Sequence, residues 1–277
     1  MKRNQLIVVG ACVALLVVLY FFGNYKKPVD GNAMPMGNGH AQPQQAAQPE
    51  GLDIEAYIAD VKSKADAPAK QTIDAAEKTN DDDALIAIYK KIDKPLAVAY
   101  YAVKGAEKNN TVKAYVSAGD YSAGLIQSAP DEKSRRFLSE NIITCYKKAV
   151  DMDSANTDNR IRLAGAYMQE GSQPMSGVLM LLDIVKKDST NVDAQLMLGR
   201  FGLISGQIDK AIARFEKVLY LQPQNSEALF MLAEAYNNQG NKQKAIDLLE
   251  RCKKTVKDAE TKKEIEKAIE TIKKPKS

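Results

Sequence analysis

The sequence contains no tryptophan, and aromatic residues occupy only 6% of its 277 positions. Strands prefer β-branched and aromatic side chains, whereas alanine, leucine, lysine and glutamate favour helices. Because the helix-favouring residues dominate, the composition argues against a β-sheet protein and predicts an all-α protein. With 45% apolar and 27% charged residues, the chain is long enough for one large or two small domains with a buried core.

The residues and motifs of common catalytic sites are also scarce. The single histidine, His40, lies among glycine, proline and glutamine and has no neighbour for proton or metal chemistry. The chain lacks a His-Glu-x-x-His motif, a glycine-rich phosphate loop and a Gly-x-Ser-x-Gly motif. We therefore expect no enzymatic activity, no cofactor and no metal site. The acidic run 81–83 is interpreted as charge and capping at a helix N-terminus.

Cysteines are few, and their spacing forms no framework. Cys12, Cys145 and Cys252 are far apart and make no Cys-x-x-Cys pair, so we expect the last two to be core residues. The net charge of +4 comes from residues 253–277, where nine lysines face five acids. No arginine cluster or interleaved aromatics accompany these lysines. The segment therefore predicts a solvated helix face and no nucleic-acid partner.

One long apolar run stands near the N-terminus. Seventeen apolar or small residues extend without interruption from Leu6 to Phe22, with basic residues before and after them. As a helix this run spans about 26 Å, which just crosses the hydrocarbon core of a bilayer. We expect a transmembrane helix over 6–23, in contact with the lipid bilayer. A cleaved signal peptide and a lipidated Cys12 are the alternatives.

The orientation of this span depends on a margin of one charge. The tail 1–5 carries two basic side chains and the free amine, against the two lysines 26–27 on the other side. The more positive flank stays inside. We therefore expect a cytoplasmic tail over 1–5, a single pass through the cytoplasmic (inner) membrane, and a periplasmic or extracytoplasmic C-terminal domain.

A linker is predicted between the span and the rest of the chain. Residues 24–51 are rich in proline, glycine, glutamine and asparagine and carry few charges or large apolar side chains. Such a composition cannot form a core. A flexible tether of this length reaches roughly 25–30 Å, so the folded part can stand clear of the lipid headgroups.

A repeat with a period of 34 residues lies near the C-terminus. The stretch LISGQIDKAIARF, residues 203–215, is followed at that spacing by NNQGNKQKAIDLL, residues 237–249. Each copy joins two helical patterns through a glycine, and periods of this size are typical of stacked helical units that share one continuous core. The matching positions are Gly206 with Gly240, Ala211 with Ala245, and Phe215 with Leu249.

This pattern resembles the tetratricopeptide repeat (TPR) family. In that family a first helix with Leu-Gly/Ala-x-x-Tyr is followed by a glycine turn and a second helix with Ala-x-x-x-Phe and a proline. The sequence supplies the first part as Leu232, Ala233 and Tyr236, and the second as Ala211, Phe215 and Pro223. The resemblance is strong over 157–251. It departs from the family at Gly202, where tyrosine is usual, and at Gln195 and Leu229, where tryptophan is usual, so packing there must differ.

The resemblance implies a TPR-type α-solenoid of stacked helical hairpins. We expect degenerate TPR-like units over 52–156, TPR repeats over 157–256, and a capping helix with a basic tail over 257–277. The cap is indicated by one apolar stripe, formed by Ile265, Ala268, Ile269 and Ile272. A second stripe, Ile54, Ile58, Val61 and Ala65, predicts a helix within 52–79 that docks on the first units or forms a short coiled coil, with Pro68 kinking or ending it.

In TPR proteins the first helix of each unit lines a concave groove that binds proteins or peptides. Carried onto this chain, the groove positions are Ile161, Arg162, Leu196, Met197, Arg200, Phe230, Met231, Glu234, Asn237 and Asn238. The resemblance thus implies a membrane-anchored scaffold or adaptor in envelope assembly, secretion or protein maturation. A self-associating structural protein, as a homo-oligomer, and a cytoplasm-facing adaptor are the alternatives.

One specialised TPR function is disfavoured by the same comparison. TPR domains that hold chaperone C-terminal carboxylates use a clamp of lysine, asparagine and arginine across three units. Arg162 and Arg200 offer cations here, but the lysine and asparagine positions of the clamp are occupied by Ile161, Gly165, Asp193 and Glu227.

Overall fold

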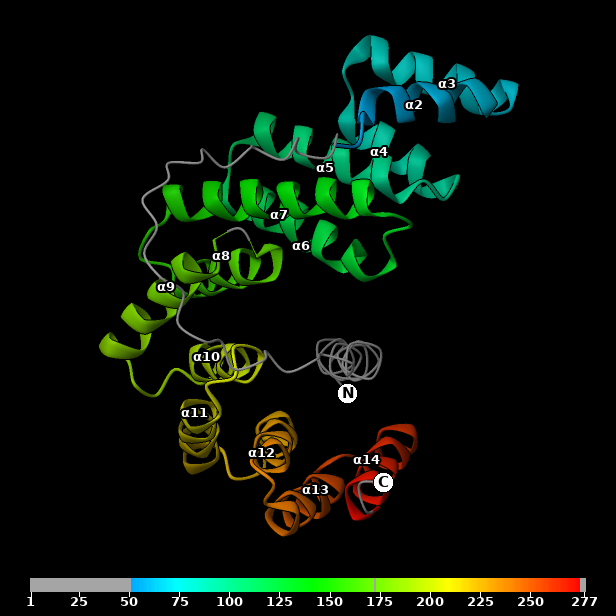
Figure 1. Ribbon diagram of the computed structural model, residues 1–277. Helices are drawn as coiled ribbons and strands as arrows, with labels where there is room; N and C mark the ends of the chain where they lie inside the picture. The colour runs from blue at the N-terminus through cyan, green and yellow to red at the C-terminus, as the bar shows by residue number, and fades with distance from the viewer. Residues whose placement is uncertain (1–50, 172, 275–277) are drawn as a thin grey trace, which may run out of the picture. The chain divides into compact units, whose positions relative to one another are not determined.

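The computed structural model describes residues 51–274 with the exception of Ser172 (Figure 1). The predicted cytoplasmic tail 1–5, the predicted span 6–23, nearly all of the linker 24–51, and with them Cys12 and His40, lie outside this part of the chain. Among the described helices, none combines the length and the apolar character needed to span a membrane.

Every regular element of the described part is helical, with thirteen α-helices and one short 3-10 helix. The all-α prediction is confirmed. In chain order the helices are α2 (Ile54–Lys64), α3 (Ala67–Thr79), α4 (Asp82–Lys91), α5 (Pro95–Asn109), α6 (Val112–Leu125), η1 (Ile126–Ser128), α7 (Glu132–Met152), α8 (Thr157–Glu170), α9 (Pro174–Lys187), α10 (Val192–Ile204), α11 (Ile208–Leu221), α12 (Ser226–Asn238), α13 (Lys242–Thr255) and α14 (Ala259–Lys273).

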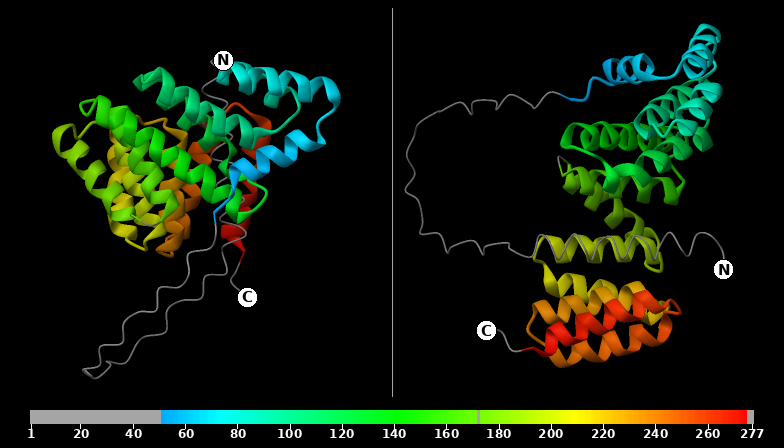
Figure 2. Two further views of the ribbon diagram at one scale, coloured as in Figure 1. Left: turned by 90° about the horizontal axis from the view of Figure 1, so that it is seen from above. Right: turned by 90° about the vertical axis from the view of Figure 1, so that its right-hand side faces the viewer.

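From α4 onward, consecutive helices pair into hairpins. The pairs are α4 with α5, α6 with α7, α8 with α9, α10 with α11, and α12 with α13. The second helix of each pair also packs on the first helix of the next pair, so the hairpins are stacked in chain order, as Figures 1 and 2 show. The buried apolar residues of these helices thus pack mainly against helices that are adjacent in sequence. The described part is an all-helical, TPR-like solenoid.

The glycines that punctuate the sequence repeat form the turns within its hairpins. Gly206 and Gly240 have φ angles of +73° and +84°, in the left-handed region that a Cβ disfavours. The backbone closes in the same way after both, since the N–H of Gln207 donates to the carbonyl of Gly202 at 2.7 Å and that of Asn241 to Tyr236 at 2.8 Å. The predicted turns are confirmed.

Small residues bring the paired helices α10 and α11 into close contact. A Cβ added at Gly199 would lie 2.5 Å from Cε1 of Phe215, whose side chain is fully buried. At Gly202 an added Cβ would lie 3.1 Å from Cβ of Ala211 and 3.2 Å from its backbone nitrogen. The tyrosine usual at this position of the repeat family has no space here, which explains the departure noted in the sequence.

The last helix closes the apolar core of the repeats. Ile265 and Ile269 of α14 are buried in the same cluster as Phe215, Leu249 and Cys252, and Ala268 and Ile272 pack against it. Most remaining positions of α14 are exposed lysine, glutamate or threonine. The predicted apolar stripe is confirmed, and the arrangement is consistent with a cap.

The N-terminal helices differ from the prediction in one respect. The stripe from Ile54 does not continue to Ala65, because α2 ends at Lys64 and Ala65 has an extended backbone, with ψ of 152°. Asp66 then caps a separate helix by accepting from the N–H of Ala69 at 2.8 Å, and Pro68 lies in its first turn, where proline is tolerated. The segment 52–79 therefore holds two helices.

The docking alternative for this segment is confirmed. Ile58 and Val61 of α2 are buried in one cluster with Ile73 of α3, Leu85 of α4 and Val98 of α5. No helix in this cluster is left with an open apolar stripe of the kind that a coiled coil needs.

Two local predictions are also confirmed, one for the acidic run 81–83 and one for the burial of two cysteines. Asp81 is the N-cap of α4, where its side chain accepts from the N–H of Ala84 at 2.9 Å, and the next two aspartates lie in the first turn. Cys145 and Cys252 are both buried, as expected of core residues. Burial raises the pKa of Cys145 to about 12, which keeps its thiol protonated.

Candidate functional site

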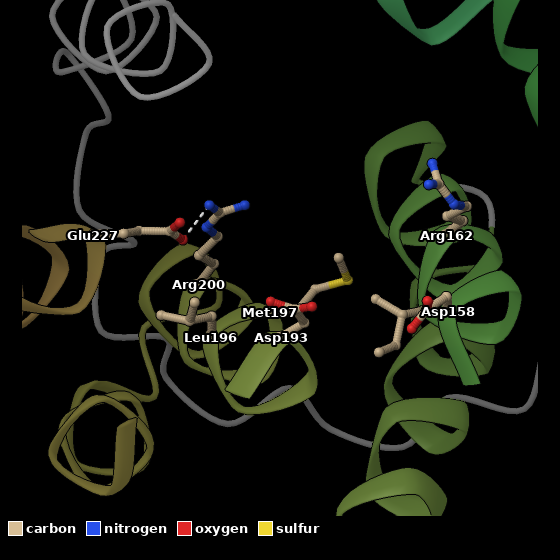
Figure 3. Close-up of a pocket in the computed structure, with 8 residues that line it drawn as sticks. Asp158, Arg162, Asp193, Leu196, Met197, Arg200 and Glu227 are labelled. Atoms are coloured by element: carbon tan, nitrogen blue, oxygen red, sulfur yellow. Dashed lines mark hydrogen bonds and ion pairs between the residues drawn. The ribbon is translucent and has the colours of Figure 1, made fainter. Parts of the chain in front are cut away.

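Residues from α8, α10 and α12 surround one cavity of about 320 Å³ (Figure 3). Five of the ten predicted groove residues line it, namely Ile161, Arg162, Leu196, Met197 and Arg200. Three acidic residues complete the lining: Asp158, Asp193 and Glu227. The cavity thus combines an apolar floor with cations and carboxylates from three successive repeat units.

The acids share one position in their helices. Each helix begins after an asparagine N-cap, Asn156, Asn191 or Asn225, whose Oδ1 accepts from the backbone N–H three residues on at 3.0, 2.9 and 2.9 Å. The acid is the second residue of the helix in all three cases. A carboxylate in the first turn is favoured by the positive end of the helix. The local helix start therefore fixes where each carboxylate lies along the cavity.

Both arginines of the cavity are held by carboxylates. The guanidinium of Arg200 on α10 contacts Glu227 on α12 (Figure 3). Nη1 of Arg162 on α8 donates to Oδ1 of Asp120 on α6 at 2.5 Å, and the hydroxyl of Tyr146 donates to the same oxygen at 2.7 Å. These pairs connect neighbouring hairpins, and they satisfy part of the hydrogen-bonding capacity of each cation.

The apolar floor comes from α8 and α10. Ile161 and Leu196 are 8% and 7% exposed, and Met197 is half-buried. Figure 3 shows the Met197 side chain directed from α10 toward α8. It reaches α8 at Gly165, where an added Cβ would lie 3.2 Å from the methionine Cε. A glycine at this position of the repeat leaves room for the methionine, whose flexible thioether suits a surface that adapts to partners.

The other five predicted residues lie on α12 and do not line this cavity. Met231 is only 4% exposed within the C-terminal core, and Phe230 packs partly against the same core, so both serve the fold. Glu234 is partly buried, and this burial raises the pKa of its carboxyl group. Asn237 and Asn238 are exposed near the end of the helix. A contribution of these five side chains to binding stays a prediction.

The acidic lining was missed by the sequence reasoning. Asp193 and Glu227 entered only as departures from a carboxylate clamp, and Asp158 did not enter at all. A signal was present, because the pattern Asn-x-Asp/Glu recurs at 156–158, 191–193 and 225–227. Each copy marks a helix start of the same kind, and each places a carboxylate in the lining of the cavity.

The lining of this cavity offers three kinds of side chain for contact with a ligand. Its lining contains arginines, carboxylates and apolar side chains, with no serine, cysteine or histidine among the eight residues. Between residues 51 and 274, with Ser172 left aside, no three or more histidine, cysteine, aspartate or glutamate side chains are grouped so as to hold a metal ion.

Comparison with known families matches the C-terminal part of the chain. A family model described as tetratricopeptide repeat covers residues 202–273. The matched segment runs from the end of α10 to the end of α14 and therefore includes Gly206, Gly240 and the capping helix.

Two curated relatives share sequence with part of this chain. The peroxisomal targeting signal receptor of Candida albicans is 36% identical over 84 residues, which are 30% of this chain and 14% of the receptor. The receptor of the same name from Saccharomyces cerevisiae is 31% identical over 103 residues, which are 36% of this chain and 16% of the receptor. The match thus spans less than a fifth of either relative.

Solved TPR proteins were also found. MamA is 19% identical, with 64% of this chain and 94% of MamA covered and a TM-score of 0.47. YrrB, described as a TPR protein with an unusual peptide-binding site, is 18% identical, with 72% of this chain and 99% of that protein covered and a TM-score of 0.44. The tetratricopeptide resemblance of the sequence is supported by the family model over residues 202–273.

Proposed function

We propose that this protein is a non-enzymatic, membrane-anchored scaffold or adaptor that binds protein partners in the groove formed by α8, α10 and α12. The observation that carries the proposal is the cavity itself, with its apolar floor and charged rim across three repeat units. Such a lining suits the side chains of a peptide or helix. Roles in envelope assembly, secretion or protein maturation are consistent with this activity.

Two further observations support protein binding. The family model that matches 202–273 is that of a repeat used for protein interaction. The two yeast relatives are named as receptors for a targeting signal, and a receptor of this kind recognises a segment of another protein. We carry only this general mode of recognition over to the present chain.

The membrane anchor and the location are part of the same proposal. They are supported by the apolar run from Leu6 to Phe22 and by the slightly more positive charge of residues 1–5. The chain would then cross the cytoplasmic membrane once, with its N-terminus inside and the solenoid in the periplasm at the end of the linker 24–51. A reporter fused after Ser277 tests the orientation, and activity confined to the cytoplasm would instead support the cytoplasm-facing adaptor.

One surface favours self-association as the second candidate function. Met175, Leu179 and Leu182 follow one another at helical spacing on α9 and are 57%, 62% and 38% exposed. Three exposed apolar side chains on one helix face are unusual for a surface that meets only water. A second copy of the chain could cover them.

Crosslinking of the full chain in its native membrane, followed by mass spectrometry, separates the two functions. Met197→Glu places a charge in the groove, whereas Met175→Glu places the same charge on α9. The groove function predicts that partner crosslinks fall about tenfold or more in Met197→Glu and stay in Met175→Glu. Loss of crosslinks between copies of the chain in Met175→Glu alone would support the self-associating protein. Circular dichroism checks that both variants are folded.

A further inference from the structure

The cavity between α8, α10 and α12 carries more negative than positive charge. Its two cations are each engaged by a carboxylate, Arg162 by Asp120 and Arg200 by Glu227. An arginine that already holds a carboxylate of its own chain is a poor receptor for a second carboxylate from a partner. The charge of each guanidinium is therefore largely neutralised within the chain, which weakens its attraction for a partner's carboxylate.

The remaining carboxylates of the cavity have no such counter-charge. Asp158 on α8 and Asp193 on α10 are exposed, and in the described part of the chain neither forms an ion pair. Together with Asp120 and Glu227 they place four carboxylates against two guanidinium groups. Asp120 lies outside the lining and is counted because it neutralises Arg162. The N-termini of α8, α10 and α12 each contribute roughly half a positive charge, which reduces this excess of two negative charges without cancelling it. The cavity thus favours a cation.

An apolar side chain fits beside that cation. The floor of the cavity is formed by Ile161, Leu196 and Met197, and Figure 3 shows the two free carboxylates on facing helices on either side of the Met197 side chain. A volume of about 320 Å³ is at the small end of ligand pockets. It accommodates one or two side chains of a peptide segment, with the apolar part on the floor and the charge between Asp158 and Asp193.

We propose that this cavity selects peptide segments in which a lysine or arginine stands next to a large aliphatic residue. The selectivity rests on the proposed function, because it assigns the chemistry of the partner to the same groove. It also predicts rejection of segments that present a carboxylate at this place, since a like charge next to Asp158 and Asp193 is repelled.

Fluorescence anisotropy with the detergent-solubilised full chain tests this selectivity. The probes are four labelled twelve-residue peptides that differ only at two central positions, Leu-Lys, Leu-Glu, Ser-Lys or Ser-Glu, in a glycine-serine background. We expect the Leu-Lys peptide to bind at least tenfold more tightly than the Leu-Glu and Ser-Glu peptides, and more tightly than Ser-Lys. Its advantage over Leu-Glu should shrink between 50 and 300 mM salt, because partly exposed charges are screened.

Variants assign the effect to the two aspartates. Asp158→Asn combined with Asp193→Asn should weaken Leu-Lys binding about tenfold and leave the Leu-Glu peptide unchanged or slightly stronger. Asp193→Lys should move the preference toward Leu-Glu. Glu260→Gln is the matched control, because Glu260 is the corresponding first-turn acid of α14 and lies outside the cavity. It loses the same helix-end interaction and should leave all four affinities unchanged.

Several results would overturn the selectivity. Binding of Leu-Glu as tight as that of Leu-Lys would do so, as would an unchanged Leu-Lys affinity in the double variant, or the absence of binding by any of the four peptides. In each of these cases the crosslinking experiment still tests the proposed function separately. Partner crosslinks that form in the unsubstituted chain and are lost in Met197→Glu support that function. A chain that forms no partner crosslinks counts against it.

Discussion

The two halves of the solenoid form similar helical hairpins with different residues. After residue 156, the turns at Gly171, Gly206 and Gly240 have positive φ angles of 81°, 73° and 84°, and all are glycine. Before it, the positive φ angles belong to Asn80, Asp93 and Asn110, at 51°, 54° and 46°. Asparagine and aspartate are the side chains that tolerate this conformation best. Asp93 lies within the α4–α5 hairpin, as the glycines lie within theirs, whereas Asn80 and Asn110 lie before and after that hairpin. A left-handed residue can thus occur between helices without a glycine to mark it in the sequence.

The cores of the two halves differ as well. Four tyrosines are buried in the first half, at positions 89, 101, 115 and 146. In the described residues after 156, Phe215 is the buried aromatic side chain, and the rest of that core is aliphatic. The first half therefore buries phenol hydroxyls that need hydrogen-bond partners, and the second half does not. A buried hydroxyl without a partner lowers stability, whereas one with a partner does not, so individual tyrosines should differ in their contributions.

The largest expected effect comes from the aromatic core of the second half. Phe215→Ala removes a fully buried ring that fills the space left by Gly199, and it should lower the free energy of unfolding by about 3–5 kcal/mol. Urea unfolding of the detergent-solubilised chain, followed by circular dichroism, measures the loss. Tyr220→Ala on the same helix is the control, because that side chain is 79% exposed and should change stability by about 0.5 kcal/mol or less. Equal losses in both variants would contradict the assigned packing.

Substitutions at Gly206 and Asn110 test whether a positive φ angle has the same energetic consequence in the two halves. Gly206→Ala forces a Cβ into the left-handed region, and it should cost about 1–2 kcal/mol. Asn110→Gly keeps the conformation accessible at an exposed position, and it should change stability by about 0.5 kcal/mol or less. Thermal unfolding of both variants gives the comparison. A cost at Asn110 as large as that at Gly206 would show that the asparagine side chain has a role beyond its φ angle.

The smallest effects should come from two buried hydroxyls of the first half, and they should have opposite signs. The hydroxyl of Tyr89 is buried without a hydrogen-bond partner, so Tyr89→Phe should stabilise the protein by about 1 kcal/mol. The hydroxyl of Tyr146 donates to Asp120 at 2.7 Å, so Tyr146→Phe should destabilise it by about 1 kcal/mol. Chemical denaturation resolves the pair, and two changes of the same sign would refute the assigned partners.

Much of the second half could be predicted from the sequence because local signals agree there. Three features follow from residues that recur at a fixed spacing. These are the glycine turns, the close contact of α10 with α11 at Gly199 and Ala211, and the apolar stripe of α14. The sequence did not reveal that 52–79 holds two helices, because a proline within a helical pattern can indicate either a kink or an end. Pro68 is in fact part of a start, since Asp66 caps α3 just before it. A proline in the first turn after an N-cap residue therefore indicates a helix start.

The candidate site could be predicted only in part. Family positions selected the apolar floor and both arginines, but they did not show that α12 turns Met231 into the core, since burial depends on the neighbouring helix. Nor did the sequence show that Arg162 pairs with Asp120, which is 42 residues earlier in the chain. Pairing between distant residues requires the stacking of hairpins, and it decides whether an arginine is free to receive a partner's carboxylate.

The asparagine caps at the rim of the cavity have a consequence for how specificity can diverge. Each cap supplies the hydrogen bond that starts the helix, while the side chain two residues later carries the charge that lines the cavity. Folding and recognition are thus assigned to separate positions of the same short turn. Under the proposed selectivity, a substitution at 158 or 193 would alter which partners are accepted while the helix start is kept. New partners could then be acquired in small steps without loss of the fold.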